Sequence, residues 1–199
     1  MTKMVVVLIA LIISANLNAK DVSEFDIKGI KLGMNKNEVS KRMPCSSYKK
    51  IYNRFKNGKV YNSSFLCGNS GSQTDAYFLV DFDHNNYVFG VHKQIVFESR
   101  PNFSKIKTKL IKRYGNFTSI EKRYIDGDYG RYIYCWGDCR SSDDLGKQLT
   151  VNYAYFLDYN NILLSLYDYK RQKDNREWTH NRMELYAKKR KEKASNIDF

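Results

Sequence analysis

The sequence of 199 residues contains only 2 prolines and 11 glycines, far fewer than collagen-like or low-complexity chains require. It has one long apolar run, Met4 to Ile13, whereas a protein that crosses a membrane repeatedly needs several runs of about twenty residues. Disordered chains are excluded as well, because aromatic side chains make up 15% of the sequence. These absences leave a folded domain, or a close pair of small ones.

The sequence also lacks the motifs of common enzymes. It has no Gly-x-Ser-x-Gly motif, and its 3 histidines are scattered without the spacing of zinc ligands. Asp81 and Asp83 alternate on a predicted strand, but aspartates at strand ends usually form turns. We therefore expect no metal, no cofactor and no catalytic activity. The alternative is a hydrolase of an anionic envelope polymer that uses Asp81, Asp83 or His92.

Residues 1–19 have the features of a secretory signal peptide. Lys3 provides a positive charge, Met4 to Ile13 is too short to span a bilayer, and Ala19 suits the position before a cleavage site. No cysteine stands at or near the predicted cleavage site, where Lys20 follows Ala19, so a lipid-modified N-terminus is not expected. Cleavage before Lys20 would release a periplasmic or secreted protein that is not integral to the membrane. An uncleaved anchor is the alternative.

All 4 cysteines follow this leader. An even number in an exported chain predicts disulfide bonds, and four cysteines allow three pairings. We favour Cys45–Cys67 and Cys135–Cys139, because each pair is local and each falls in a different half of the chain. A redox motif has two residues between its cysteines, whereas three separate Cys135 from Cys139.

The predicted secondary structure follows the same order twice. A short strand and turn over 25–34 lead into a helix over 36–43, with Asn35 and Glu38 placed as a capping box. A second helix covers 103–114 and ends at Gly115. A tail over 175–196 is rich in helix-forming residues, and Trp178 and Leu185 are expected to dock it on the sheet. Alternating patterns predict strands at 48–55, 59–67, 75–83, 87–97, 117–125, 129–136, 148–159 and 162–169, with turns that include 57–58, 83–86, 126–127 and 160–161.

This order predicts an internal duplication with a period of about seventy residues. Lys41-Arg42 is repeated at Lys112-Arg113, and Cys67 at Cys139, although these identities are few. We expect an α+β fold of two tandem units, each a helix followed by an antiparallel sheet, with a basic helix at the C-terminus. The expected boundaries are 20–98 for the first unit, 99–170 for the second and 171–199 for the basic C-terminal helix and tail.

One segment resembles a known family. Gly29 to Val39 (GIKLGMNKNEV) is similar to the Gly-Ile-x-Leu-Gly-Met-x-x-x-x-Val opening of small exported bacterial proteins, including outer-membrane assembly lipoproteins and domains with a β-lactamase-inhibitor-like fold. In that fold a helix or helical pair precedes an antiparallel sheet, and some members carry the unit twice. The resemblance implies an exported binding or assembly module without an active site. A structural role in envelope assembly is therefore a further alternative.

Lysine and arginine outnumber acidic residues by 34 to 21, which gives a formal net charge of +13. Basic side chains gather in the second predicted helix and in the tail. An exported protein rarely meets nucleic acid, so we expect no nucleic-acid partner. An acidic protein or an anionic envelope component is the natural target of this charge. The alternative is a solvated basic surface.

Tyr132, Tyr134 and Trp136 share one face of a predicted strand, and Arg140 follows it. Aromatic residues beside arginine are typical of binding hot spots, so these four are the candidate binding residues. The alternative is that the aromatic stripe packs in the core beneath a helix. We expect an exported, non-catalytic binding protein of a bacterial envelope, which recognises a protein or an anionic surface through a disulfide-stapled sheet face.

Overall fold

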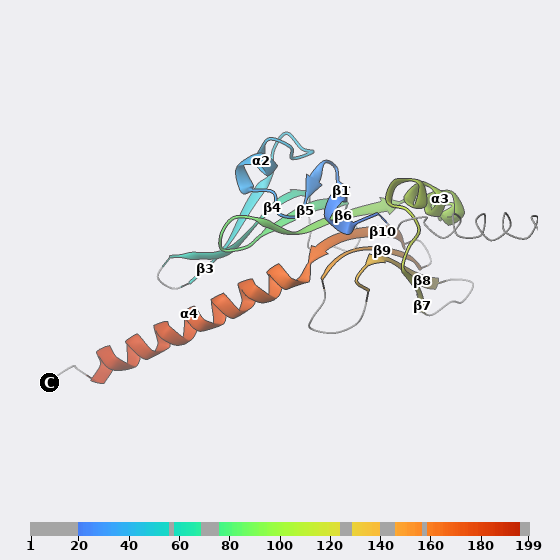
Figure 1. The fold of residues 1–199 in the computed structure, drawn as a ribbon. Helices are drawn as coiled ribbons and strands as arrows, with labels where there is room; N and C mark the ends of the chain where they lie inside the picture. The colour runs from blue at the N-terminus through green and yellow to red at the C-terminus, as the bar shows by residue number, and fades with distance from the viewer. Residues whose placement is uncertain are drawn as a thin grey trace, which may run out of the picture.

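The computed structural model describes residues 20–55, 58–68, 76–123, 129–139, 146–156 and 159–195, without the side chains of 156 and 159. The predicted leader, Arg140 and the predicted turn at 126–127 lie outside the described residues. The fold is α+β, as predicted, with a large antiparallel sheet and a long C-terminal helix (Figure 1).

One continuous sheet of eight strands replaces the two sheets that the sequence predicts. Its spatial order is β3-β4-β5-β6-β10-β9-β8-β7. The two halves join where β6 pairs with β10, with Val91 opposite Leu166. This pairing satisfies the backbone groups of two strands that would otherwise be sheet edges. The strands are β3 (Lys49–Arg54), β4 (Val60–Gly68), β5 (Tyr77–Phe82), β6 (Val88–Phe97), β7 (Ser119–Arg123), β8 (Tyr129–Gly137), β9 (Lys147–Phe156) and β10 (Tyr159–Asp168).

Two helices form where the sequence predicts them. Helix α2 (Lys36–Ser40) begins with the expected capping box, in which Asn35 Oδ1 accepts from Glu38 N and Glu38 Oε2 accepts from Asn35 N, both at 3.0 Å. It ends three residues before the predicted 43. Helix α3 (Phe103–Tyr114) has the predicted bounds, and Gly115 follows it with a φ of +81°.

The first described segment forms a small hairpin rather than one strand. A 3₁₀ turn, η2 (Val22–Glu24), leads into β1 (Asp26–Ile27) and β2 (Ile30–Lys31), which pair across Lys28 and Gly29. Both turn residues have positive φ, at 58° and 79°. The hairpin lies with α2 and α3 over one face of the sheet (Figure 1). The core fills the space between this upper layer and the sheet.

The predicted turn at Asn160 and Asn161 is wrong. Both residues belong to β10, and Asn161 pairs with Val96 on one side and Ala154 on the other. The preference of asparagine for turns depends only on its immediate neighbours in the chain, whereas β10 is hydrogen-bonded to β6 and β9 along its length. The ladders therefore override the local preference.

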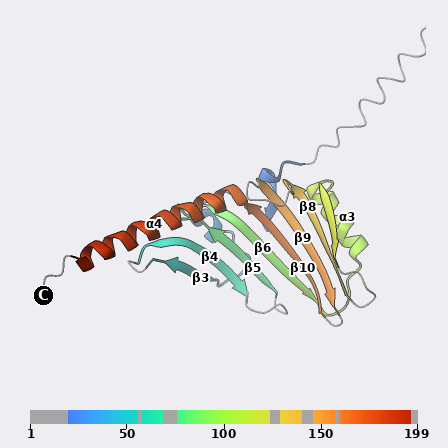
Figure 2. The ribbon, with the colours of Figure 1, turned by 90° about the horizontal axis from the view of Figure 1, so that it is seen from below.

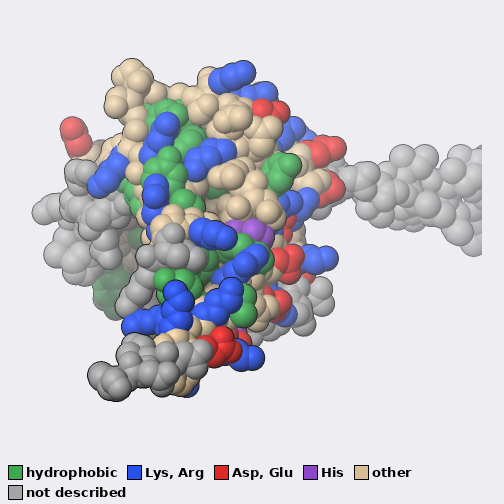
Figure 3. Space-filling model, turned by 90° about the vertical axis from the view of Figure 1, so that its left-hand side faces the viewer, with side chains coloured by type: hydrophobic (Ala, Val, Ile, Leu, Met, Phe, Trp, Pro, Cys, Tyr) green, Lys and Arg blue, Asp and Glu red, His purple; other side chains and the backbone are tan. Residues whose placement is uncertain are grey.

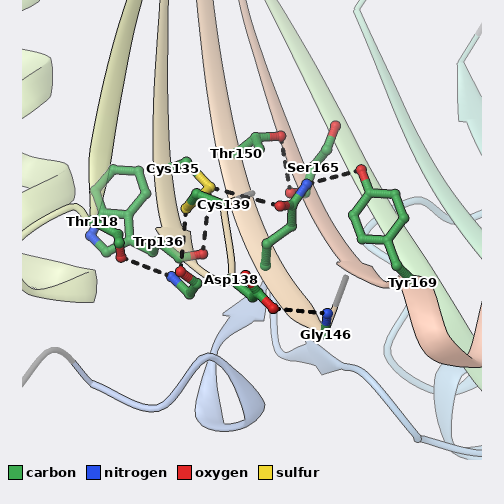
Figure 4. The surroundings of a disulfide bond; sticks show 11 residues. Thr118, Cys135, Trp136, Asp138, Cys139, Gly146, Thr150, Ser165 and Tyr169 are labelled. Carbon is green, nitrogen blue, oxygen red and sulfur yellow. Dashed lines mark hydrogen bonds between the residues drawn. A yellow bond between two sulfur atoms is a disulfide. The ribbon is translucent and has the colours of Figure 1, made fainter. Parts of the chain in front are cut away.

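Both predicted disulfide bonds are present, Cys45–Cys67 and Cys135–Cys139. The first ties the segment after α2 to β4. The second closes a short loop at the end of β8, where Gly137 N donates to Thr118 Oγ1 at 3.2 Å (Figure 4). The two bonds thus hold separate parts of the chain against the sheet.

The C-terminal helix α4 (Tyr169–Ser195) starts directly after β10, six residues earlier than predicted. It runs along one end of the sheet toward β3 and projects past it (Figures 1 and 2). Among the described residues, no helix is both long and apolar enough to cross a bilayer.

Candidate functional site

The predicted aromatic stripe packs in the core. Tyr134 and Trp136 are 4% and 2% exposed, and Trp136 Nε1 donates to Gly115 O at 2.8 Å. Tyr132 is partly buried and stacks on Phe103 of α3. Burial raises the pKa of the Tyr134 hydroxyl. These side chains therefore present no binding face, and the structure favours the alternative interpretation of the stripe.

The register explains why this stripe points inward. Tyr134 lies opposite Val151 and Trp136 opposite Leu149, and both partners are fully buried. Paired residues of an antiparallel sheet point to the same face, so the aromatic rings enter the core with their partners.

The three residues of the hydrolase alternative separate into two groups. Asp83 forms a turn, where its Oδ1 accepts from Asn85 N and Tyr87 N at 2.9 Å. Its Oδ2 lies 2.9 Å from Arg171 Nη1. Asp81 instead contacts His92 on the neighbouring strand, with 3.3 Å between Oδ2 and Nε2. Asp81 and His92 are therefore brought together, while Asp83 holds helix α4.

Helix α4 makes several contacts with the turn between β5 and β6. The side-chain oxygen of Asn175 contacts both the backbone nitrogen of His84, at 2.9 Å, and its Nδ1, at 2.7 Å. The imidazole of His84 stacks on Trp178, and Phe55 lies against the same indole at a centroid distance of 6.0 Å. The expected docking by Trp178 is confirmed, whereas Leu185 remains 45% exposed.

Beyond Trp178, the helix and the end of β3 enclose a cavity of about 190 Å³, which we call the α4 groove. The Arg182 guanidinium lies 5.4 Å from the centre of the Trp178 ring, so the cation covers one aromatic wall. The apolar walls are Phe55, Trp178, Leu185 and Tyr186, and the cations are Lys59, Arg182 and Lys189.

The charge of α4 matches this groove. The helix contains ten lysine or arginine residues and four aspartate or glutamate residues. In Figure 3, which views the molecule from the side toward which α4 points, blue basic side chains border green hydrophobic ones. The arrangement is suited to a ligand that combines negative charge with an apolar group.

The sequence does not predict this groove. It indicates that Trp178 docks and that the tail is basic, but Phe55 and Lys59 lie more than a hundred residues earlier in the chain. Only the path of α4 along the end of the sheet brings these residues together (Figure 2).

A separate cluster of polar side chains lies on the face of the sheet that points away from α2 and α3. We call this face the lower face. Asp81 lies between the core residues Val80 and Phe82, and alternation along the strand turns it away from them. Ser64 Oγ donates to Asp81 Oδ1 at 2.6 Å, and Ser165 Oγ lies 2.9 Å from His92 Nδ1. The lower face thus carries a connected chain of Ser64, Asp81, His92 and Ser165.

The described part of the chain contains no group of three or more histidine, cysteine, aspartate or glutamate side chains placed to hold a metal ion. Comparisons with family models, curated proteins and solved structures give no significant match.

Proposed function

We propose that this is an exported, non-catalytic binding protein that recognises an acidic segment of a partner protein through the α4 groove. The observation that carries the proposal is the combination of apolar walls and a cationic rim in one cavity. Trp178 is held between His84 and Arg182, so it is a pre-positioned aromatic beside arginine. An acidic segment with one large apolar side chain would satisfy both features.

Export is proposed on independent grounds. Two disulfide bonds are typical of oxidising compartments, and the sequence of residues 1–19 has the pattern of a signal peptide. A periplasmic or secreted location would place the basic helix among anionic envelope components. Its charge would speed the encounter with an acidic partner.

We also propose that the sheet arose from two tandem units. Strands β3 to β6 follow α2, strands β7 to β10 follow α3, and the last strands of the two sets meet at the centre. Both helices begin after an asparagine, Asn35 or Asn102, whose side chain accepts a backbone hydrogen bond. The β-lactamase-inhibitor-like resemblance at Gly29–Val39 remains a prediction.

The binding proposal is tested with two peptides of equal length. Both are rich in glutamate, and one has a central leucine where the other has alanine. We expect the full mature protein to bind the leucine peptide about tenfold more tightly in fluorescence anisotropy, because burial of the larger side chain contributes about 1.5 kcal/mol. Added salt should weaken both complexes.

Two variants of α4 make this test specific. Leu185 and Met183 are both exposed, at 45% and 52%, but only Leu185 lines the groove. Leu185→Asp should abolish the preference for leucine, whereas Met183→Asp makes the same change in charge and should keep it. Equal effects of the two variants would contradict the proposal. Tighter binding to phosphatidylglycerol vesicles than to either peptide, with no change in Leu185→Asp, would also contradict the proposal. That result would indicate a membrane surface as the target.

A further inference from the structure

Three polar side chains form a chain of contacts across neighbouring strands of the lower face. Ser165 Oγ of β10 lies 2.9 Å from His92 Nδ1 of β6, and His92 Nε2 lies 3.3 Å from Asp81 Oδ2 of β5. The register places His92 directly opposite Ser165, and it places Asp81 opposite Gly90, one step along the same face. The sheet thereby assembles a serine, a histidine and an aspartate that the sequence keeps apart.

The carboxylate of Asp81 determines which nitrogen of His92 carries the proton in the neutral ring. An ionised carboxylate only accepts hydrogen bonds, so the facing Nε2 must donate. Nδ1 is then an acceptor, and the Ser165 hydroxyl donates to it. This polarity is that of a histidine base positioned by a third group to activate a serine.

The surroundings hold this arrangement while leaving it accessible. Ser64 Oγ donates a hydrogen bond to Oδ1, the other oxygen of the Asp81 carboxylate, at 2.6 Å. This bond fixes the orientation of the carboxylate. A Cβ atom at Gly90 would lie 3.2 Å from Asp81 Oδ2, so glycine leaves room for the carboxylate. The side chains of His92 and Asp81 are 14% and 17% exposed, and Ser165 is also only partly buried. A small reagent can therefore reach the chain of contacts.

We propose that Ser165 is a nucleophilic serine that accepts an acyl group from an activated ester, with His92 as the base and Asp81 as its positioning residue. Ser165 Oγ forms a bond to the ester carbonyl carbon while its proton passes to His92 Nδ1. The bond from that carbon to the leaving oxygen then breaks, and the leaving alcohol takes up the proton. The products are an acyl ester of Ser165 and the free alcohol.

The same geometry sets a limit on turnover. Strand β10 is paired on both sides around Ser165, with His92 opposite on β6 and Thr150 opposite on β9. Such pairing engages the backbone N–H groups that an oxyanion hole would need. We therefore expect one acylation per molecule, followed by slow hydrolysis of the acyl ester. This reaction does not depend on binding at the α4 groove.

The test uses p-nitrophenyl acetate as the probe and the full mature protein. We expect a burst of about one equivalent of p-nitrophenol, with mass spectrometry locating the acetyl group on Ser165. Ser165→Ala should abolish the burst. His92→Gln and Asp81→Asn should slow it by about a hundredfold or more. Ser104→Ala, which changes an exposed serine of α3, should leave it unchanged.

Circular dichroism and thermal unfolding show whether each variant keeps its fold. If a variant unfolds, the acetylation site in the wild-type protein still decides the matter, because that measurement needs no substitution. Acetylation confined to lysine side chains, or spread equally over several serines, would overturn the proposal. A burst that survives Ser165→Ala in a folded variant would do the same.

Discussion

The indole ring of Trp178 lies flat on the imidazole ring of His84, with 4.1 Å between the ring centroids and 7° between their planes. Together with the Asn175 contacts to His84, this stack attaches the first half of α4 to the turn between β5 and β6. The C-terminal end of the helix, which includes the basic run Lys188 to Lys191, projects past the sheet (Figure 1). The position of the α4 groove therefore depends on one aromatic stack and a few polar contacts.

Replacing Trp178 by alanine should loosen α4 while the sheet remains folded. An aromatic pair contributes about 0.5–1.5 kcal/mol in addition to the free energy of burying its surface. Removal of the Trp178 ring should therefore weaken mainly the attachment of the helix. Hydrogen exchange monitored by mass spectrometry should show faster exchange in α4 and unchanged exchange in β9 and β10. Met183→Ala, which removes an exposed side chain from the same helix, is the control. Unchanged exchange in Trp178→Ala would show that other contacts hold the helix.

The two disulfide bonds should differ in their contribution to stability. Cys45 and Cys67 are 22 residues apart, whereas Cys135 and Cys139 are 4 apart. In the chain-entropy description, the longer loop contributes about 3 kcal/mol and the shorter about 2 kcal/mol. We expect the Cys45→Ser/Cys67→Ser variant to lose more free energy of unfolding in urea than Cys135→Ser/Cys139→Ser. The reverse order would contradict the entropic argument, and free thiols in the denatured wild-type protein would contradict the bonds themselves.

Alkaline conditions should destabilise the fold through Tyr167. Burial raises the pKa of this hydroxyl above its ordinary value of 10.0, and the nearby Asp81 carboxylate acts in the same direction. Because the pKa is higher in the folded state, this contribution to stability is fully present below pH 10.0 and is lost as the pH rises toward the folded-state value. Burial also raises the pKa values of Tyr114, Tyr134 and Tyr153.

The measurement compares urea unfolding of the wild-type protein and Tyr167→Phe at about pH 8 and about pH 11. The free energy of unfolding should fall less steeply with pH in the variant, because one ionisable hydroxyl has been removed. Burial lowers the pKa values of Lys36 and Lys93, which acts in the opposite sense in both proteins and cancels in the comparison. Identical pH dependence in the two proteins would contradict the assignment to Tyr167.

Local patterns predict most of the helices and strands and both disulfide bonds. The Asn35 capping box, the bounds of α3 and the cysteine pairs depend on residues close together in the sequence. The failures have a common cause. The sequence predicts a turn at Asn160 and Asn161 and offers Tyr134 and Trp136 as a binding face, because it does not show how these residues pair with distant strands.

The order of most helices and strands and the concentration of basic charge in α4 can be predicted from the amino-acid sequence, which also favours the observed cysteine pairs. The folded chain is needed to see that β6 pairs with β10, which merges the strands into one sheet and sets Ser165 opposite His92. It is also needed to see that Phe55 meets Trp178 in the α4 groove. Helix caps and short loops follow from local geometry, whereas strand register follows from hydrogen bonding and burial across the whole sheet.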